Sequence, residues 1–288
     1  MCDDALISTP ALCQLLQLGV PVCFLGHRGN LLGSFEPPGV SHPLARLRQY
    51  AATNASDQSL LFARALVEAK IANGRRLLQR LEANHPRLPS DAITMLSSLL
   101  QSAAKAATLD ELRGHEGTAA QHFYTAWSLF LPPDFPFEKR SRRPPLNPVN
   151  ACLSYLATIL YGELLSACYA SGLDPALGCL HTVENGRWAL PLDLMEPFRP
   201  VIVESLTLRL FSLQVLNADH FTPQAGGVYL SGDGRRLLWQ HYEQRLTREF
   251  FSEHAAHRTT LRRLIQDAPT HFKTCLDRPE LFHPFRPN

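Results

Sequence analysis

The sequence predicts a mainly α-helical protein. A truncated β remnant (a helix plus a β-hairpin) over residues 1–40 precedes a large all-helical domain over residues 41–288. Two observations predict this fold class. From Leu44 onward, long stretches carry apolar residues at three- and four-residue spacing, which is the period of an amphipathic helix. Runs rich in β-branched and aromatic residues, which are typical of strands, are recognised only before residue 38. With 288 residues and a hydrophobic content of 45%, the chain can bury a sizeable core.

The first elements are a short helix and two short strands. The stretch STPALCQLLQLG begins with Ser8 or Thr9 as a helix cap and ends at Gly19. The runs VPVCFLG and LLGSFEP flank a turn at residues 27–30 and predict a hairpin. Because two strands do not form a stable sheet alone, they are expected to pair with something outside this sequence, or the chain is cut at its start.

The helical domain is expected to contain several long helices separated by turns. A capping box at Thr108 and Glu111 opens one of them, and Gly172 ends another. A proline-rich basic loop over residues 131–148 interrupts the helices, because prolines at that density cannot lie inside one. A loose tail is expected over about residues 270–288. The predicted helices cover residues 59–81, 92–107, 108–130, 150–172, 204–216 and 234–251.

Composition excludes some classes of protein and leaves others open. Seven cysteines without a CxxC pair argue against a disulfide framework and favour a reducing, cytoplasmic setting. The start lacks the pattern of a signal peptide. The most apolar stretch, Leu153–Ala170, contains Glu163 and is expected to be a core helix, so no membrane span is expected. A net charge of +2 does not by itself indicate nucleic-acid binding, which depends on how the charge is distributed.

A few acids and one histidine are candidates for a metal site. Asp193 and Glu196 are three residues apart at the expected start of a helix, which would place both on one face. His181 precedes them by a short loop, and Glu116 lies on an apolar side of a helix, where a carboxylate needs a partner. Two carboxylates and an imidazole suit Mg²⁺ or Mn²⁺ better than Zn²⁺. From the residues alone, this pattern is more often a solvated acid pair at a helix start together with a surface or core histidine than a metal site.

Ordered motifs point to a known family. They are HEGTAAQHFYTAW, RRPPLNPVNACLSYLATILYGEL, GLDPALGCLH and LPLDLMEPFRP. In this order the chain resembles the CRISPR adaptation integrase family over nearly its whole length. Members of that family are metal-dependent enzymes that insert spacer DNA into CRISPR arrays. The resemblance implies that the helical domain is the metal-binding catalytic part.

The resemblance also implies roles for individual residues. Glu116, His181 and Glu196 would be the catalytic ligands of a Mg²⁺ or Mn²⁺ ion. The residues implied to support them are Asp193 as a nearby acid, Arg199 facing phosphate, Asn150 in a structural place or near the site, and Tyr161 approaching the site.

The implied reaction is transesterification, in which a DNA 3′-hydroxyl attacks a phosphodiester with no covalent enzyme intermediate. Water in place of the hydroxyl would give nuclease activity. DNA contacts are expected from basic clusters, although such clusters are more often solvated faces, and binding through them should weaken with salt. The residues expected to contact DNA are Lys139, Arg140, Arg142, Arg143, Arg75 and Arg76.

Partners follow from the same resemblance. A full member begins with a β-domain that forms a homodimer interface and contributes to binding a small ferredoxin-like partner. Only the last portion of that domain is recognised here, so dimerisation and partner binding stay open for this chain. A late start, a trimmed chain or a fusion to an upstream module would each account for this. The alternatives to an integrase are a stand-alone metal-dependent nuclease acting on branched DNA, and a non-catalytic DNA-binding assembly module.

Overall fold

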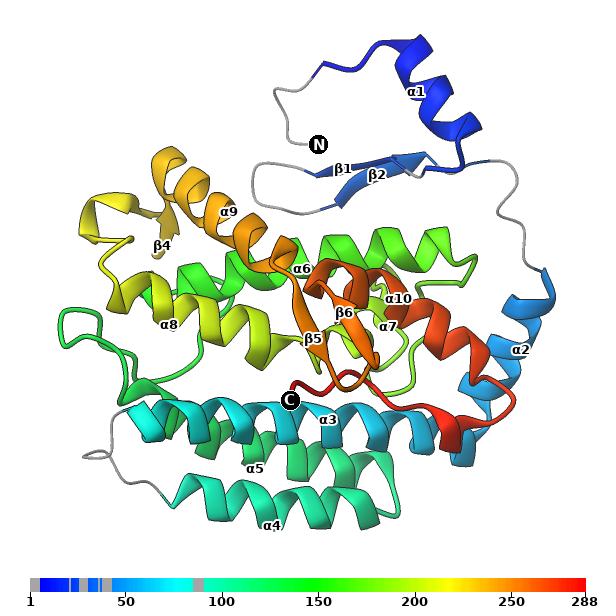
Figure 1. The fold of residues 1–288 in the computed structure, drawn as a ribbon, viewed down its shortest axis with the longest axis horizontal. Helices are drawn as coiled ribbons and strands as arrows, with labels where there is room; N and C mark the ends of the chain where they lie inside the picture. The colour runs from blue at the N-terminus through cyan, green and yellow to red at the C-terminus, as the bar shows by residue number, and fades with distance from the viewer. Residues whose placement is uncertain (1–5, 21, 26–30, 36, 38–42, 85–90) are drawn as a thin grey trace. The chain divides into compact units, whose positions relative to one another are not determined.

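The structure is a computed structural model that describes residues 6–20, 22–25, 31–35, 37, 43–84 and 91–288. The described chain is mainly helical (Figure 1), which confirms the predicted fold class. It forms two compact units, each drawn from three separated segments. The first comprises residues 1–66, 158–195 and 263–284, and the second comprises residues 67–157, 196–262 and 285–288. The predicted turn at 27–30 and the predicted domain boundary at 40–41 lie outside the described residues.

The N-terminal elements form where they were predicted. Helix α1 (Thr9–Gln17) is capped by Ser8, whose hydroxyl accepts a hydrogen bond from the Ala11 N–H at 3.4 Å. Strands β1 (Val22–Leu25) and β2 (Leu31–Phe35) pair antiparallel. The hairpin and its preceding helix are therefore confirmed.

The first unit is built mainly from helices. Its core includes Phe62. The centroid of its ring lies 4.7 Å from that of Phe272 and 5.2 Å from that of Phe282. Helices α3 and α6 continue into the second unit, so the division between the units falls inside these two helices. The helices that contribute are α2 (Pro43–Asn54), α3 (Ser56–Asn84), α6 (Pro148–Ala170), α7 (Ala189–Met195) and α10 (Leu261–Thr274).

In the second unit, α4 (Ala92–Lys105) and α5 (Leu109–Ser128) lie side by side and are joined by a short turn (Figure 1). The Thr108 hydroxyl accepts from the Glu111 N–H at 3.2 Å, and the Glu111 carboxylate accepts from the Ala107 N–H at 2.7 Å. This exchange satisfies two backbone donors at the start of α5, as the capping sequence predicts.

The rest of the second unit contains strands that the sequence did not predict. Helices α8 (Ser205–Ser212) and α9 (Gly232–Thr247) are accompanied by two small hairpins. Strands of three or four residues are too short to show a clear alternation of apolar and polar residues. The structure shows the turn of one hairpin clearly: Ala225 and Gly226 both have positive φ, as a type I′ two-residue turn requires. The strands are β3 (Phe221–Gln224), β4 (Gly227–Leu230), β5 (Phe250–Ser252) and β6 (His257–Thr259).

Helix α6 is long and apolar enough to cross a membrane, with a mean hydropathy of 1.4 over its most apolar window. However, 61% of that window is buried inside the protein, as expected for a core helix. It is the one such helix among the residues that the structure describes.

The expectation of a loose tail over residues 270–288 is wrong. Helix α10 continues to Thr274, and Cys275, Leu276, Phe282 and Phe285 after it are buried. In the second unit, the Phe285 ring stacks on Phe198 at 5.3 Å, and the Asn73 side chain donates to the Phe285 carbonyl at 2.9 Å. Sequence periodicity does not reveal this packing, because single aromatic anchors between prolines and charged residues form no regular pattern.

Candidate active site

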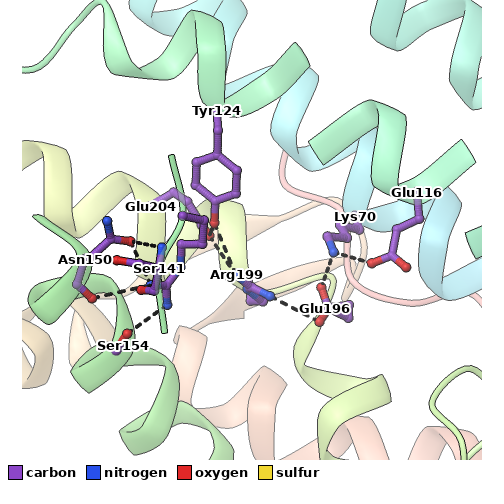
Figure 2. Close-up of polar contacts among 10 residues, drawn as sticks. Lys70, Glu116, Tyr124, Ser141, Asn150, Ser154, Glu196, Arg199 and Glu204 are labelled. Carbon is purple, nitrogen blue, oxygen red and sulfur yellow. Dashed lines mark hydrogen bonds and ion pairs between the residues drawn. The ribbon is translucent and has the colours of Figure 1, made fainter. Parts of the chain in front are cut away.

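Two of the predicted ligands meet at a lysine in the second unit. Lys70 on α3 forms an ion pair with Glu116 on α5, and its Nζ lies 2.6 Å from Oε2 of Glu196. Figure 2 shows the ammonium group between the two carboxylates. The Glu196 side chain is only 4% exposed, whereas those of Lys70 and Glu116 are 18% and 20% exposed. Two acids that are 80 residues apart in the sequence thus converge on one cation.

The position of Glu196 depends on the end of α7. The helix ends at Met195, because Pro197 disfavours a helical conformation for the residue before it. The Asn73 side chain then donates to the Pro197 carbonyl at 2.7 Å and fixes the turn. The expectation that Asp193 and Glu196 share one helical face is therefore wrong. The helix stops before Glu196, and the two carboxylates bind different partners.

The positive charge of Lys70 is stabilised by the two neighbouring carboxylates rather than by water. Burial alone lowers the pKa of Lys70, yet Glu196 and Glu116 outweigh it, so the pKa is raised above the ordinary value of a lysine. The lysine is therefore a permanent cation at neutral pH.

Arg199 ties Glu196 to a second buried acid. Its guanidinium lies 3.3 Å from Glu196 Oε1 and 3.4 Å from Glu204 Oε1. The Tyr124 hydroxyl donates to Glu204 at 2.7 Å and accepts from Arg199 at 3.2 Å (Figure 2). The Arg199 side chain is 8% exposed. Burial lowers its pKa, but Glu196, Tyr124 and Glu204 raise it by more, so the pKa lies above the ordinary value of an arginine. The expectation that Arg199 faces phosphate is thus wrong, since its guanidinium is buried among acids.

His181 and Asp193 form a separate arrangement within the first unit. Asp193 is fully buried, and its carboxylate accepts from the N–H groups of Cys179 at 2.5 Å, Leu180 at 2.9 Å and His181 at 2.9 Å. It also lies 2.7 Å from Nδ1 of the His181 ring. A carboxylate on one ring nitrogen is the usual support for a metal-binding histidine, which then uses the other nitrogen. Asp193 thus orients the His181 ring, and its supporting role at a metal site stays a prediction.

Gly178 is required for this arrangement. A Cβ atom there would run into the Asp193 carboxylate and lie 3.0 Å from the backbone carbon of Ala189. We expect Gly178→Ala to lower the free energy of unfolding by about 1–3 kcal/mol, because the added methyl overpacks a buried site. Urea unfolding would measure this loss, with Gly117→Ala as the control because nothing lies within 4 Å of a Cβ there. Equal stability of the two variants would contradict the close approach.

Asn150 fastens the basic loop rather than contacting the carboxylates. It is fully buried, and its side-chain oxygen accepts from Arg140 and from the Ser141 N–H, both at 2.9 Å. Its amide nitrogen donates to the Lys139 carbonyl at 2.9 Å, and Arg140 also donates to Ser154 at 3.0 Å. Burial lowers the pKa of Arg140 to about 10. Arg140, which was expected to contact DNA, is thus occupied in holding the loop.

The other residues expected to contact DNA differ in exposure. Lys139, Arg142 and Arg143 are exposed on the loop, as a DNA-binding surface requires. Arg75 donates to the Ser97 hydroxyl on α4 at 3.0 Å, and Arg76 donates to the Asn288 carbonyl at 3.1 Å. These last two side chains therefore already have partners within the protein.

Tyr161 lies on α6 within the first unit, which also contains His181. Burial raises the pKa of its hydroxyl to about 12, so it is protonated at neutral pH. Its approach to the carboxylates stays a prediction.

Sequence reasoning missed Lys70, Tyr124 and Glu204. The one signal available for Lys70 was a single cation in the apolar stretch VEAKIAN, flanked by Ala69 and Ile71, both of which are buried. A charged residue at such a position needs an opposite charge nearby. Nothing in the sequence pairs Glu204 with Arg199.

The carboxylates of Glu116 and Glu196 fit a hard divalent ion, because both supply oxygen ligands and already converge on a cation. His181 with its carboxylate support fits the nitrogen ligand. No group of three or more His, Cys, Asp or Glu side chains that could hold a metal ion is found among the described residues. Within the second unit, two of the three predicted ligands come together, whereas His181 belongs to the first unit.

Comparison with known proteins identifies the family. The sequence model of the family described as CRISPR associated protein Cas1 matches residues 1–244. The chain belongs to the Cas1 family. The resemblance inferred from the motifs is thus confirmed.

Two Cas1 relatives show how much of a longer protein this chain covers. It is 38% identical over 266 residues to a CRISPR-associated exonuclease Cas4/endonuclease Cas1 fusion of Rhodospirillum rubrum. That match covers 90% of this chain but only 46% of the fusion. It is 39% identical over 240 residues to a CRISPR-associated endonuclease Cas1 of Thermus thermophilus, covering 83% of this chain and 72% of that protein.

Solved Cas1 structures share the fold. A Cas1 protein from Thermotoga maritima superposes with a TM-score of 0.79 at 28% identity, covering 94% of this chain and 83% of that chain. A partial Cas6-RT-Cas1–Cas2 complex gives a TM-score of 0.80 at 24% identity over 97% of this chain and 84% of that chain. The second match shows the fold alone.

Proposed function

We propose that this chain carries the catalytic part of a divalent-metal-dependent Cas1 integrase, which joins DNA 3′-hydroxyl ends to a CRISPR repeat by transesterification. The observation that carries the proposal is the convergence of Glu116 and Glu196, from separate elements, on one cation. The supporting comparison is membership of the Cas1 family.

The residues divide the chemistry among them. Glu116, Glu196 and His181 would hold Mg²⁺ or Mn²⁺, which would polarise the target phosphodiester and stabilise charge on its oxygens. Asp193 keeps the His181 ring oriented through Nδ1. Arg199 holds one oxygen of Glu196 and leaves the other directed at Lys70. Of the predicted supporting residues, Asn150 would act indirectly, by holding the basic loop in place through its hydrogen bond to the Lys139 carbonyl.

The nucleophile in this proposal is a DNA hydroxyl rather than a protein side chain. The described cysteines are free thiols, and burial raises the pKa of the Cys152 thiol to about 12. Such a thiol is a poor nucleophile at neutral pH. Free thiols also agree with a cytoplasmic, reducing location.

DNA is the proposed substrate, both as the spacer duplex and as the CRISPR repeat. Lys139, Arg142 and Arg143 are the proposed phosphate contacts, because they are exposed on the loop. The proposed protein partners are the small ferredoxin-like adaptation protein, for which the Cas1–Cas2 assembly is the precedent, and a second copy of this chain.

A strand-transfer assay tests the proposal. The protein is mixed with a short duplex bearing free 3′-hydroxyls and a supercoiled plasmid carrying a repeat array, in Mg²⁺ or Mn²⁺, with and without the small partner. We expect covalently joined DNA that disappears with EDTA and whose yield falls as salt rises. The relatives' endonuclease names favour one second candidate, a stand-alone nuclease, which would give cleavage without joining. Branched DNA is the substrate expected for it. DNA binding with neither reaction would indicate an assembly module and overturn both.

A further inference from the structure

The unexpected feature of the carboxylate cluster is its lysine. Lys70 contacts one oxygen of Glu116 and lies 2.6 Å from Oε2 of Glu196, so the ammonium stands where the two acids converge. Resting on the proposed function, we propose that Lys70 is the resident cation of the metal-free site, and that a divalent ion binds by replacing it between Glu116 and Glu196.

Burial makes a cation necessary in both states. The Glu196 side chain is 4% exposed, so water cannot solvate its charge when no ion is present. A buried carboxylate needs nearby positive charge, and in the metal-free protein Lys70 supplies it at Oε2 while Arg199 lies at Oε1. The lysine therefore stabilises the acids in a converging arrangement before any metal arrives.

The same contacts make Lys70 a competitor of the metal. A carboxylate oxygen directed at an ammonium group cannot at the same time be directed at an ion in the same place, and the two cations repel each other. With Lys70, the two carboxylates and the ammonium sum to a charge of minus one. With a divalent ion in place of the ammonium, the two carboxylates and the ion sum to zero. The divalent ion is thus favoured when its concentration is sufficient.

Arg199 explains how Glu196 can exchange one cation for another without moving far. The guanidinium holds Oε1 of Glu196 at 3.3 Å, whereas Lys70 is at Oε2. Oε1 stays anchored while the partner of Oε2 changes. The carboxylate therefore presents the same oxygen to the lysine and to the incoming ion.

The test is Mn²⁺ binding to Lys70→Gln, measured by titration calorimetry or by the loss of the free-ion electron paramagnetic resonance signal. We expect Lys70→Gln to bind Mn²⁺ at least about fivefold more tightly than wild type, which corresponds to about 1 kcal/mol. In EDTA, its urea unfolding midpoint should fall below that of wild type, and Mn²⁺ should raise it by more than it raises the wild-type midpoint. Arg262→Gln is the matched control, because it removes a partly buried ion pair with Glu243 at 2.8 Å outside the cluster.

A measurement on the wild-type protein covers the case in which Lys70→Gln does not fold. Acetylation by acetic anhydride, read residue by residue by mass spectrometry, should be slow at Lys70 in EDTA and faster in Mn²⁺. Labelling of the exposed Lys139 should not change. Equal Lys70 labelling with and without Mn²⁺, or Mn²⁺ binding to Lys70→Gln no tighter than to wild type, would overturn the proposal.

The controls separate this inference from the proposed function. If wild type binds Mn²⁺ and Glu196→Gln abolishes that binding while Lys70→Gln leaves it unchanged, only the exchange is wrong. If wild type binds no Mn²⁺, the metal site and the exchange both fall.

Discussion

Glu116→Gln is expected to lower the single-turnover rate of DNA joining by at least about a thousandfold, a loss of about 4 kcal/mol of transition-state stabilisation. Glutamine keeps the volume of the side chain but removes the charge that a divalent ion requires. Lys70 retains Glu196 as its partner, so the protein should remain folded. The rate would be measured with saturating duplex and plasmid in Mg²⁺, alongside circular dichroism of the variant.

The matched control is Asp110→Asn, which removes a carboxylate from the same helix. The Asp110 side chain is 95% exposed and lies 3.3 Å from the Arg113 guanidinium, away from the carboxylate cluster. We expect its rate to stay within about twofold of wild type. A Glu116→Gln rate within tenfold of wild type would remove Glu116 from the catalytic residues.

Arg199→Met should be the most destabilising of the substitutions considered. It leaves the carboxylates of Glu196 and Glu204, which are 4% and 3% exposed, without their shared guanidinium. Breaking a buried ion pair by removing one partner typically costs about 3–5 kcal/mol. Urea unfolding followed by tryptophan fluorescence would show the loss as a lower midpoint.

Two further variants distinguish lost charge compensation from lost packing. Adding Glu204→Gln to Arg199→Met should recover part of the stability, because one uncompensated charge is removed. Arg286→Met removes a pair with Glu68 at 3.5 Å, where the arginine is 48% exposed, and should cost less than about 1 kcal/mol. The assigned role of Arg199 would be refuted if Arg199→Met lost no more stability than Arg286→Met, or if the double variant recovered none of the loss.

The helices were predictable because each has a local cause that can be recognised in the sequence. Apolar spacing marks α3 and α4, and the hydroxyls of Ser8 and Thr108 cap the helices that follow them. Glu116, His181 and Glu196 were singled out by motif order; the family that those motifs indicated is confirmed, and the roles of the three residues as ligands stay a prediction.

What escaped prediction depends on contacts between distant parts of the chain. The pairing of Lys70 with Glu116 and Glu196, and the burial of Arg199, follow from how helices pack within the second unit. Arg140 illustrates the same limit, since a basic residue in a proline-rich loop reads equally well as a DNA contact or as an anchor for Asn150. Helix α7 was predicted to continue through Glu196, although Pro197 favoured an end there.

The division of each unit into three separated segments bears on how the protein is made. As a ribosome releases the chain, residues 67–157 emerge before the rest of the second unit, and the four residues 285–288 emerge only after the whole of 263–284. The contacts of Asn73 and Phe198 with Phe285 can therefore form only after nearly all of both units has been synthesised. Contacts between such distant segments form slowly, and neither unit can complete its packing before its last segment, which begins at residue 263 or 285, has been made. For the same reason, no single proteolytic cut releases either unit as one intact peptide.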